Sequence, residues 1–419
     1  MDYNESLKYL AGFSKQGAPV KDLSRFKALC ARLGNPERAL RCVHIVGTNG
    51  KGSVAEYIAQ GLSACGCRTG RFTSPYIVDI RERITLDGEF IPEEDFARLM
   101  TAVAGAVEEC ENRAFSQFEL LTAVCFMYFA GRADRCVIEA GIGGTLDCTN
   151  VIPCPEAAVF TSIGLDHTAI LGGTHAQIAR SKSGVIKGGS VIAAAGICTQ
   201  AMTVIEQKCA ETGARLIVPD MGELKDVESG LWGSSFTYRG VSVRTAMCGA
   251  HQIGNALTAA EALRVLPEVD FARALGGFAR AKMPARLERV SREGYPDIIL
   301  DGGHNPQAME AARAVLKSDP RPKTALIGMI DTKDYESALG VILPCFERAV
   351  FLDGFAPNAV AAERLCSAGA QYCACEASHH PAEALVRAAA LTDEGGLLFI
   401  GGSLYMAAEL RALLVGRRL

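Results

Sequence analysis

The residues best placed to do chemistry lie in one glycine-rich segment, Val43-His-Ile-Val-Gly-Thr-Asn-Gly-Lys-Gly-Ser53. A β-branched run ends there in a turn, and a helix-like segment follows. Gly47 and Gly50 let the backbone N–H groups of the turn point inward, and the start of the helix adds its positive end. Lys51 can reach the outer phosphates of a nucleotide, and Ser53 can hold Mg²⁺. The pattern predicts a loop that binds a nucleoside triphosphate, made of Gly47, Thr48, Asn49, Gly50, Lys51, Gly52 and Ser53.

This segment departs from the strict phosphate-loop pattern G-x-x-x-x-G-K-[ST]. Ile45 stands at the position of the first glycine, and Gly52 stands at that of the hydroxyl residue. A plain glycine turn between a strand and a helix is therefore the alternative for this segment taken alone. The choice between the two depends on what the rest of the chain places beside the turn.

Further polar groups follow runs that predict strands. Ser74 follows Arg71-Phe-Thr73, Glu139 ends a run that begins at Cys136, and Asp166-His167 follows Ala157–Ile163. A hydroxyl, a carboxylate and an imidazole near bound phosphates are reasonable Mg²⁺ ligands, although imidazole is an unusual one. The candidate metal ligands are Ser53, Ser74, Glu139 and His167.

Two of these residues also have ordinary structural interpretations. Glu139 could cap the turn before Gly141-Ile-Gly-Gly144, and His167 could be a satisfied residue at a helix start. Cys373, Cys375 and the pair His379-His380 have a metal-like composition, but no second paired cysteine motif accompanies them. A zinc site there is the weaker interpretation.

The spacing of apolar residues predicts an α/β fold in which strands alternate with helices. Residues 1–40 have a mixed helical pattern, and a strand at 41–46 precedes a helix from Lys51 to about Cys65 that Gly66 ends. Helices are predicted over 92–109 and 116–130, with buried parallel strands at 136–140 and 157–163. From about 190 we expect a strand, a helix and a strand, then a hairpin about Arg239-Gly240 and helices at 254–265 and 270–280.

Lys282-Met-Pro-Ala-Arg-Leu-Glu288 interrupts this alternation with a proline and charges, and we expect a hinge near 282–289. A second α/β series follows: strands at 297–301, 323–328, 348–352 and 396–400, with helices at 306–317, 333–342, about 361–368 and 381–392 and a closing helix. In an open parallel sheet ligands bind at the carboxyl ends of the strands, where Asp301-Gly-Gly-His-Asn305 also lies. The sequence therefore predicts two doubly wound units, a P-loop ATPase domain over 1–285 and a smaller Rossmann-like domain over 286–419.

Length and composition agree with this division. A chain of 419 residues is long for one core, and 49% hydrophobic residues can build two. The net charge of −4 comes from interspersed acids and bases, which leaves no basic stripe for nucleic acid or a membrane surface. The N-terminus is polar, and no apolar run approaches the roughly 18 residues that span a bilayer. We expect a cytoplasmic protein that binds small molecules and that keeps its sixteen cysteines reduced, mostly in the core.

Taken together, these residues resemble the folylpolyglutamate synthase and dihydrofolate synthase family of the Mur ligase superfamily, over about Leu33 to Leu404. The order and spacing of the matching segments are those of the family. They are Gly47–Ser53, Thr73-Ser-Pro75, Ile80–Ile84, Phe118-Glu119, Glu139–Gly144, Asp147–Asn150, Thr161–Thr168, Ser181–Lys187, His251-Gln252, Asn255, Pro284–Arg286, Asp301–Pro306 and Gly402–Tyr405.

The resemblance implies an ATP-dependent amide ligase, with a Mur-ligase-type ATP-binding domain followed by a C-terminal ligase domain. A folate carboxylate would be phosphorylated to an acyl phosphate and then attacked by the amine of L-glutamate. By the same resemblance ATP would be bound with Mg²⁺ at two sites, Asn255, Arg286 and Asp301 would contact ATP, and Lys182 would be a carbamylated lysine. His304 would lie near the reacting groups without an assigned role. The catalytic candidates are Lys51, His167, Lys182 and His304.

Four positions depart from the family pattern. Tyr76 replaces a histidine, Thr145 an arginine, Ser181 a glutamate and Ala285 a glycine. These changes spare the ATP site, and they leave open whether the acid substrate is a tetrahydrofolate polyglutamate, dihydropteroate or both. We expect a monomer.

Two other interpretations remain. One is a cell-wall Mur ligase, which carries a UDP-binding domain ahead of the phosphate loop. Only about forty residues precede the loop here, fewer than the roughly 50 of a small domain. The other is a nucleotide-binding switch that hydrolyses ATP without making an amide.

Overall fold

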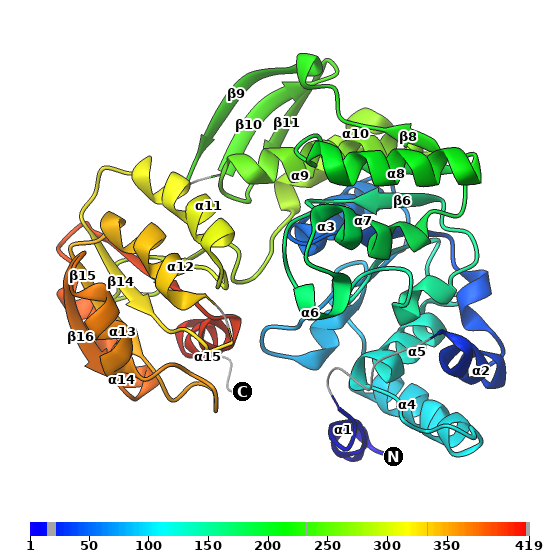
Figure 1. Ribbon diagram of the computed structural model, residues 1–419, viewed down its shortest axis with the longest axis horizontal. Helices are drawn as coiled ribbons and strands as arrows, with labels where there is room; N and C mark the ends of the chain where they lie inside the picture. The colour runs from blue at the N-terminus through cyan, green and yellow to red at the C-terminus, as the bar shows by residue number, and fades with distance from the viewer. Residues whose placement is uncertain (15–21, 232, 333, 416–419) are drawn as a thin grey trace.

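The protein, described here from a computed structural model, contains two large β-sheets and one small one (Figure 1). The structure describes residues 1–14, 22–231, 233–332 and 334–415. An eight-stranded sheet lies in the first part of the chain and a six-stranded sheet in the second. Both are mainly parallel and covered by helices, so the predicted α/β, doubly wound fold class is confirmed.

Strand β1 (Cys42–Val46) lies inside the eight-stranded sheet, parallel to β5 (Arg135–Glu139) and β6 (Ala157–Phe160). All residues of these three strands are buried, as expected for a parallel sheet covered on both faces. Val43 and Ile45 pack with α3 (Lys51–Ala64) and α9 (Ala250–Val265), whereas Cys42 faces the core that holds α5 (Gln117–Phe129). The helices therefore hold β1 from both sides and fix the loop that follows it.

The remaining elements of this part complete the sheet and its cover. The strand order is β4-β3-β2-β5-β1-β6-β7-β8. Strand β3 is antiparallel to both of its neighbours, β2 and β4, and all other neighbouring pairs are parallel. The strands are β2 (Thr69–Phe72), β3 (Ile84–Leu86), β4 (Glu89–Phe90), β7 (Ser190–Ala193) and β8 (Arg215–Ile217). The helices are α1 (Tyr3–Ala11), α2 (Ser24–Arg32), α4 (Glu93–Glu108), α6 (Thr168–Leu171), α7 (His175–Lys182), α8 (Thr199–Thr212) and α10 (Phe271–Gly276).

The six-stranded sheet has the order β12-β13-β17-β14-β15-β16, and only β12 is antiparallel to its neighbour. Helices α11, α12 and α13 share one core with this sheet, and α14 and α15 share another. The strands are β12 (Glu288–Val290), β13 (Asp297–Leu300), β14 (Lys323–Ile327), β15 (Arg348–Leu352), β16 (Ala374–Ser378) and β17 (Leu397–Gly401). The helices are α11 (Pro306–Lys317), α12 (Tyr335–Ile342), α13 (Ala362–Gly369), α14 (Pro381–Leu391) and α15 (Leu404–Val415).

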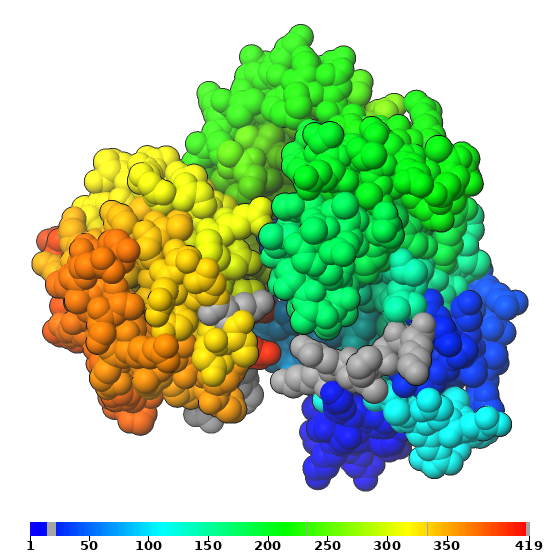
Figure 2. Space-filling view, viewed as in Figure 1, coloured from blue at the N-terminus to red at the C-terminus, as the bar shows by residue number. Residues whose placement is uncertain are grey.

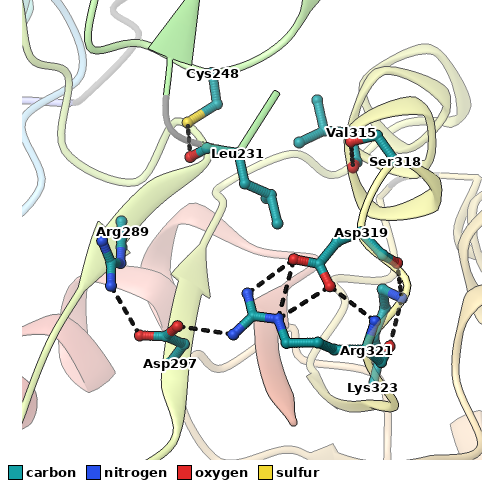
Figure 3. A network of polar contacts seen from close by, with 9 residues as sticks. All are labelled: Leu231, Cys248, Arg289, Asp297, Val315, Ser318, Asp319, Arg321 and Lys323. Carbon is teal, nitrogen blue, oxygen red and sulfur yellow. Dashed lines mark hydrogen bonds and ion pairs between the residues drawn. The ribbon is translucent and has the colours of Figure 1, made fainter. Parts of the chain in front are cut away.

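A three-stranded antiparallel sheet, β9 (Leu224–Gly230), β10 (Gly233–Tyr238) and β11 (Val241–Thr245), connects the two parts at the top of Figure 1. Leu231, between β9 and β10, and Cys248, after β11, belong to the hydrophobic core of the six-stranded sheet together with Val315. Figure 3 shows them beside a chain of ion pairs in which Asp297 and Asp319 hold Arg321. The small sheet itself packs in the core of the first part through Phe236, Tyr238 and Val243, so Leu231 and Cys248 connect it to the second part.

Most predicted elements are confirmed, several within one or two residues of the predicted bounds. The helix predicted over 306–317 and the strand over 348–352 have the predicted bounds. The hairpin about Arg239-Gly240 is also present, and both residues have positive φ, 47° and 77°, as a tight two-residue turn requires. The helix predicted over 333–342 begins at Tyr335; Lys333 lies outside the described residues, as do 15–21 of the predicted N-terminal stretch and 416–419 of the predicted second domain.

Several strands were not predicted, among them β9, β12 and β16. Strand β9 is exposed over most of its length, and β16 is an edge strand with little buried surface, so neither shows an apolar alternation. Strand β12 overlaps the end of the segment predicted as a hinge. The carbonyl of Ala285 accepts the N–H of Gly302 at 2.7 Å, so the chain joins the second part from this residue onward and Lys282–Pro284 remains as the connection.

The structure also bears on what the sequence suggested about the cysteines, a zinc site and membrane spans. All sixteen cysteines are unpaired; eight are buried, six are half-buried, and Cys154 and Cys198 are exposed. Cys375 lies in β16, and Nδ1 of His379 is 2.9 Å from Oδ1 of Asp353 rather than directed toward the cysteines. Within the described ranges, none of the helices combines the length and apolarity needed to cross a membrane.

Candidate active site

The carboxyl ends of β1, β5 and β6 open onto one cavity of about 1740 Å³, which the loop after β13 also lines. In the space-filling view the yellow and orange half meets the green and blue half along a groove (Figure 2). The cavity exceeds the roughly 300–1,000 Å³ of a typical single-ligand pocket, so it has room for more than one substrate. It brings together every predicted site residue: Gly47, Thr48, Asn49, Gly50, Lys51, Gly52, Ser53, Ser74, Glu139, His167, Lys182, Asn255, Arg286, Asp301 and His304.

The phosphate loop after β1 requires its glycines for steric reasons. A Cβ atom on Gly47 would lie 1.8 Å from Oγ1 of Thr161, and one on Gly50 would lie 2.5 Å from Oδ1 of Asn255. Two hydroxyls at the end of β6 hold the loop: Thr161 donates to the carbonyl of Asn49 at 2.8 Å, and Oγ of Ser162 accepts the N–H of Asn49 at 2.9 Å. The neighbouring strand therefore fixes the shape of the loop.

Helix α3 begins directly after this loop without a side-chain cap. Gly50 occupies the N-cap position in a left-handed conformation, and no side chain accepts the first N–H groups. Uncapped N–H groups at a helix start form a ready site for an anion. Ser53 in the first turn is buried, and its Oγ accepts from the amide of Gln252 at 3.3 Å, while Gln252 accepts from Asn255 at 3.0 Å. Helix α9 thus positions the start of α3.

Glu139, at the end of β5, lies beside the phosphate loop. Its Oε1 is 3.7 Å from Nζ of Lys51, and its Oε2 accepts the N–H of Ser74 at 3.2 Å. Burial raises the pKa of Glu139, while Lys51 acts in the opposite direction. The interpretation of Glu139 as the cap of the following turn is wrong, because Asp147 accepts the N–H groups of Gly141 and Ile142, at 2.9 and 3.0 Å.

Asp147 is in turn held by a buried polar chain that sequence reasoning did not identify. Its Oδ1 accepts from the hydroxyl of Thr149 at 2.5 Å, and that hydroxyl lies 2.8 Å from Nε2 of His44 in β1. Burial lowers the pKa of His44 to about 3, so this imidazole is neutral at ordinary pH. The motif Asp147-Cys-Thr-Asn150 was visible in the sequence, but its contact with His44 spans more than one hundred residues.

Lys182, the last residue of α7, points into the phosphate loop. Its Nζ donates to the carbonyl of Gly47 at 2.8 Å, and only 4% of the residue is exposed. Burial, together with the nearby charge of Lys51, lowers the pKa of Lys182 to about 7. Two of the departures from the family pattern meet here, since the hydroxyl of Thr145 donates to the carbonyl of Ser181 at 2.7 Å.

His167 begins α6 in a left-handed conformation, with φ 49°. It makes no side-chain capping hydrogen bond, so only its backbone fits the helix-start interpretation. Its Nε2 is 3.9 Å from Oδ2 of Asp166. The described residues contain no group of three or more His, Cys, Asp or Glu side chains close enough to hold a metal ion. Ser53, Ser74 and Glu139 nevertheless bring hydroxyl and carboxylate oxygens to the same cavity, and Mg²⁺ prefers such donors together with phosphates and waters.

The opposite wall of the cavity comes from the six-stranded sheet. The carboxylate of Asp301 accepts the N–H groups of Leu287 and Gly303, both at 2.8 Å. Burial raises the pKa of Asp301, while Arg286 lowers it. Nδ1 of His304 is 3.2 Å from the carbonyl of Gly302.

Three further residues of the cavity were not predicted as site residues. Gln307 in α11 accepts from the side-chain amide of Asn49 at 3.0 Å and so joins the two walls. In the described part of the chain, two buried polar atoms of the cavity wall have no hydrogen-bond partner. They are the hydroxyl oxygen of Ser403 and Nε of Arg83. Ser403 and Arg83 lie in family-like segments of the sequence, which is the signal that could have identified them; Gln307 had none.

Comparisons with known proteins agree with this geometry. The model of the Mur ligase middle domain matches residues 45–263, and that of the Mur ligase glutamate ligase domain matches residues 285–404. The folylpolyglutamate synthase of Lacticaseibacillus casei is 33% identical over 440 residues, with 99% of each chain covered. A dihydrofolate synthase/folylpolyglutamate synthase of Bacillus subtilis is 35% identical over 331 residues, covering 75% of this chain and 76% of the relative.

Solved structures give the same relationship. A Mycobacterium tuberculosis folylpolyglutamate synthase complexed with ADP and AMPPCP superposes with a TM-score of 0.89 at 28% identity, with 99% of each chain covered. The Escherichia coli FolC protein in complex with DHPP and ADP gives a TM-score of 0.86 at 25% identity, covering 100% of this chain and 99% of that one. The shared domains, length and architecture show that the chain belongs to the folylpolyglutamate synthase and dihydrofolate synthase family of Mur ligases.

Proposed function

We propose that this protein is an ATP-dependent ligase that joins a folate-type carboxylic acid to L-glutamate through an amide bond. The observation that carries the proposal is the single cavity that places the phosphate loop of one sheet opposite the Asp301–Asn305 loop of the other. A ligase of this kind needs a nucleotide, an acid and an amine side by side, and the cavity volume allows for them. The names of its relatives support the same reaction.

The phosphate loop and the uncapped start of α3 would bind ATP, with Lys51 turning from Glu139 toward the outer phosphates. Asn255, Arg286 and Asp301 line the same cavity and would contact the nucleotide. Ser53, Ser74, Glu139 and His167 would hold Mg²⁺ at two sites, and the ion would neutralise charge on the transferred phosphoryl group. The tuberculosis folylpolyglutamate synthase complexed with ADP and AMPPCP supports the binding of ATP.

In the first step an oxygen of the substrate carboxylate would attack the γ-phosphorus, and ADP would leave. In the second step the amine of L-glutamate would attack the acyl carbon, and phosphate would leave with both electrons of the broken C–O bond. The chain contributes mainly by positioning the reactants and by excluding water. His304 lies opposite the phosphate loop, near the place where the acid and the amine must meet.

Lys182 is proposed to carry a carbamate. A pKa of about 7 leaves a large share of its amine neutral near pH 8, and a neutral amine can attack carbon dioxide and release one proton. The product replaces a cation with an anion that has two oxygen acceptors. ¹³C NMR with labelled bicarbonate should give a carbamate signal that Lys182→Arg abolishes; an unchanged spectrum in the variant would remove the assignment.

The finer properties are also proposals. Division of the chain into an ATP-binding domain over 1–285 and a ligase domain over 286–419 is supported by the two sheets and by the two matched segments. The unpaired cysteines support a reducing compartment such as the cytoplasm. We propose a monomer, because the cavity draws all its walls from one chain.

One experiment tests the function and the choice of substrate together. ADP release should require both an acid, either dihydropteroate or a tetrahydrofolate, and L-glutamate, and mass spectrometry should show a product heavier by one glutamyl residue. Comparing the two acids decides between a monofunctional and a bifunctional enzyme. Equal ADP release without acid or glutamate would instead identify a nucleotide switch.

A further inference from the structure

Arg83 is an arginine in the wall of the cavity that forms no close ion pair with a carboxylate of the described residues. Its Nε is buried without a hydrogen bond, and within the described residues no carboxylate lies at ion-pair distance from its guanidinium. The group rests on the ring of Tyr76, with Cζ 5.3 Å from the ring centroid. A half-buried cation without a close ion pair loses solvation and gains little in return. Such a group is expected where an anion binds.

Two other arginines near this wall, Arg71 and Arg81, differ from Arg83 in this respect. Arg81, two residues earlier, bonds Asp79 at 2.6 Å and lies 3.3 Å from Glu93. Arg71 bonds Glu56 at 2.5 Å. Their charges are paired at short range within the protein, whereas that of Arg83 is not.

The surroundings of Arg83 place the missing anion near the reacting centre. The carbonyl of Arg83 accepts the N–H of Thr73 at 3.1 Å, which fixes it beside Ser74, whose own N–H donates to Glu139. Lys51, Arg286 and Arg83 all act on the buried carboxylate of Glu139. The cavity thus carries more positive than negative charge near Glu139, which suits anionic ligands.

We propose that Arg83 binds the substrate carboxylate that becomes phosphorylated, an assignment that rests on the proposed ligase function. The phosphate loop and Lys51 already match the nucleotide, and Arg83 lies on a different segment that presents the aromatic ring of Tyr76 to the cavity. Its guanidinium donates to the carboxylate oxygen that does not attack phosphorus. That oxygen becomes the carbonyl oxygen of the acyl phosphate and carries negative charge when the amine attacks, so Arg83 is a catalytic residue.

Tyr76 positions this guanidinium through its ring. A neutral aromatic face attracts a cation and holds it in one orientation. Tyr76→Phe keeps the ring and should retain most activity, whereas Tyr76→Ala should lower kcat/KM for the acid. In an Arg83→Ala background the loss from Tyr76→Ala should largely disappear, because the two residues act on the same substrate group.

The test compares Arg83→Ala, Arg83→Gln and Arg83→Lys with the wild type, varying the acid, ATP and L-glutamate separately. We expect kcat/KM for the acid to fall about 100-fold or more in the first two variants, less in Arg83→Lys, and KM for ATP to change less than about threefold. The affinity for the acid without ATP should fall in parallel. Methylguanidinium should restore part of the activity of Arg83→Ala but none of that of Lys51→Ala.

Several outcomes would overturn the proposal. One is unchanged kcat/KM for the acid; another is a loss confined to KM for L-glutamate, which would assign Arg83 to the amino acid. A loss with tetrahydrofolates but not with dihydropteroate would assign it to a non-reacting carboxylate. Arg98→Gln, on the exposed face of α4, serves as the surface control, and melting temperatures check folding. If the wild type itself shows no acid-dependent turnover, the proposed function fails. If the wild type is active and the Arg83 variants have the same kinetics as the wild type, only the Arg83 assignment fails.

Discussion

Two loops occupy the same topological position in the two large sheets and are built in opposite ways. The phosphate loop follows β1 and begins α3, and the Asp301–Asn305 loop follows β13 and begins α11. Helix α3 has no side-chain cap, whereas Asn305 caps α11 by accepting the N–H of Ala308 at 2.8 Å. One helix start is left open to a ligand, and the other is closed by its own side chain. Equivalent places in related folds can therefore serve binding in one case and positioning in the other.

The largest expected effect comes from filling the space that the phosphate loop leaves empty. In Gly47→Ala the new methyl group would clash with Thr161, so the loop must move. The backbone N–H groups of the loop would then no longer point toward the bound phosphates. We expect kcat/KM to fall about 1000-fold, or ~4 kcal/mol, with the fold retained. Gly105→Ala is the matched control, because no atom lies within 4 Å of its added Cβ. A mild loss in Gly47→Ala would mean that the loop does not bind phosphate in this shape.

Removal of the loop's cation should have the next largest effect. Lys51→Ala should stay folded, because the ammonium makes one long ion pair, 3.7 Å from Glu139. Its kcat/KM should fall about 100-fold, because the transferred phosphoryl group is stabilised less. Lys208→Ala on the exposed surface of α8 is the control. A drop below about tenfold, or ~1.4 kcal/mol, would contradict the role of Lys51.

Asn305→Ala tests the closed helix start. Loss of a side-chain cap costs about 1 kcal/mol of the free energy of unfolding, and the freed N–H groups remain in contact with solvent. Denaturation in urea should show this loss, while Asn305→Asp, which can still accept the bond, should show little. If Asn305→Ala weakens ATP binding as strongly as the phosphate-loop variants, the two loops are more alike than the structure indicates.

The last prediction concerns pH. Because burial depresses the pKa of Lys182 to about 7 from the unfolded value of 10.5, the unfolded chain binds more protons between these values. This lysine therefore makes stability rise from pH 7 to about 10. The difference in free energy of unfolding between the wild type and Lys182→Met, measured without nucleotide or carbon dioxide, should grow in favour of the wild type over that range. A difference independent of pH would mean that Lys182 is protonated normally in the folded state.

The contrast between the loops was only partly predictable from the sequence. The position of both loops follows from the rule that ligands bind at the carboxyl ends of parallel strands, so Glu139 and His167 could be placed at that edge of the first sheet and Asp301 at that edge of the second. Local chemistry also identified the glycines of the phosphate loop. The contacts that fix these groups were not predictable, because they join residues far apart in the chain, as His44 joins Thr149 and Gln307 joins Asn49.

Edge and exposed strands were missed for a different reason. Apolar alternation indicates a strand only where one face is buried, and β9 has few buried residues. The predicted hinge is wider than the connecting segment Lys282–Pro284. Charges and a proline mark a break in the pattern, but they do not show with which of the two parts the residues after the break form hydrogen bonds. The hydrogen bonds of Ala285 and Leu287 to the second part supply that information.

The eight buried thiols have a consequence for handling the protein. Within the fold, burial raises the pKa of several of these cysteines, such as Cys125 and Cys148, so they form little thiolate and react slowly. Unfolding returns all sixteen to an ordinary pKa of about 8.5 in a single flexible chain. Oxidation would then couple them at random and prevent refolding, so unfolding without a reductant should be irreversible and its apparent midpoint should depend on heating rate.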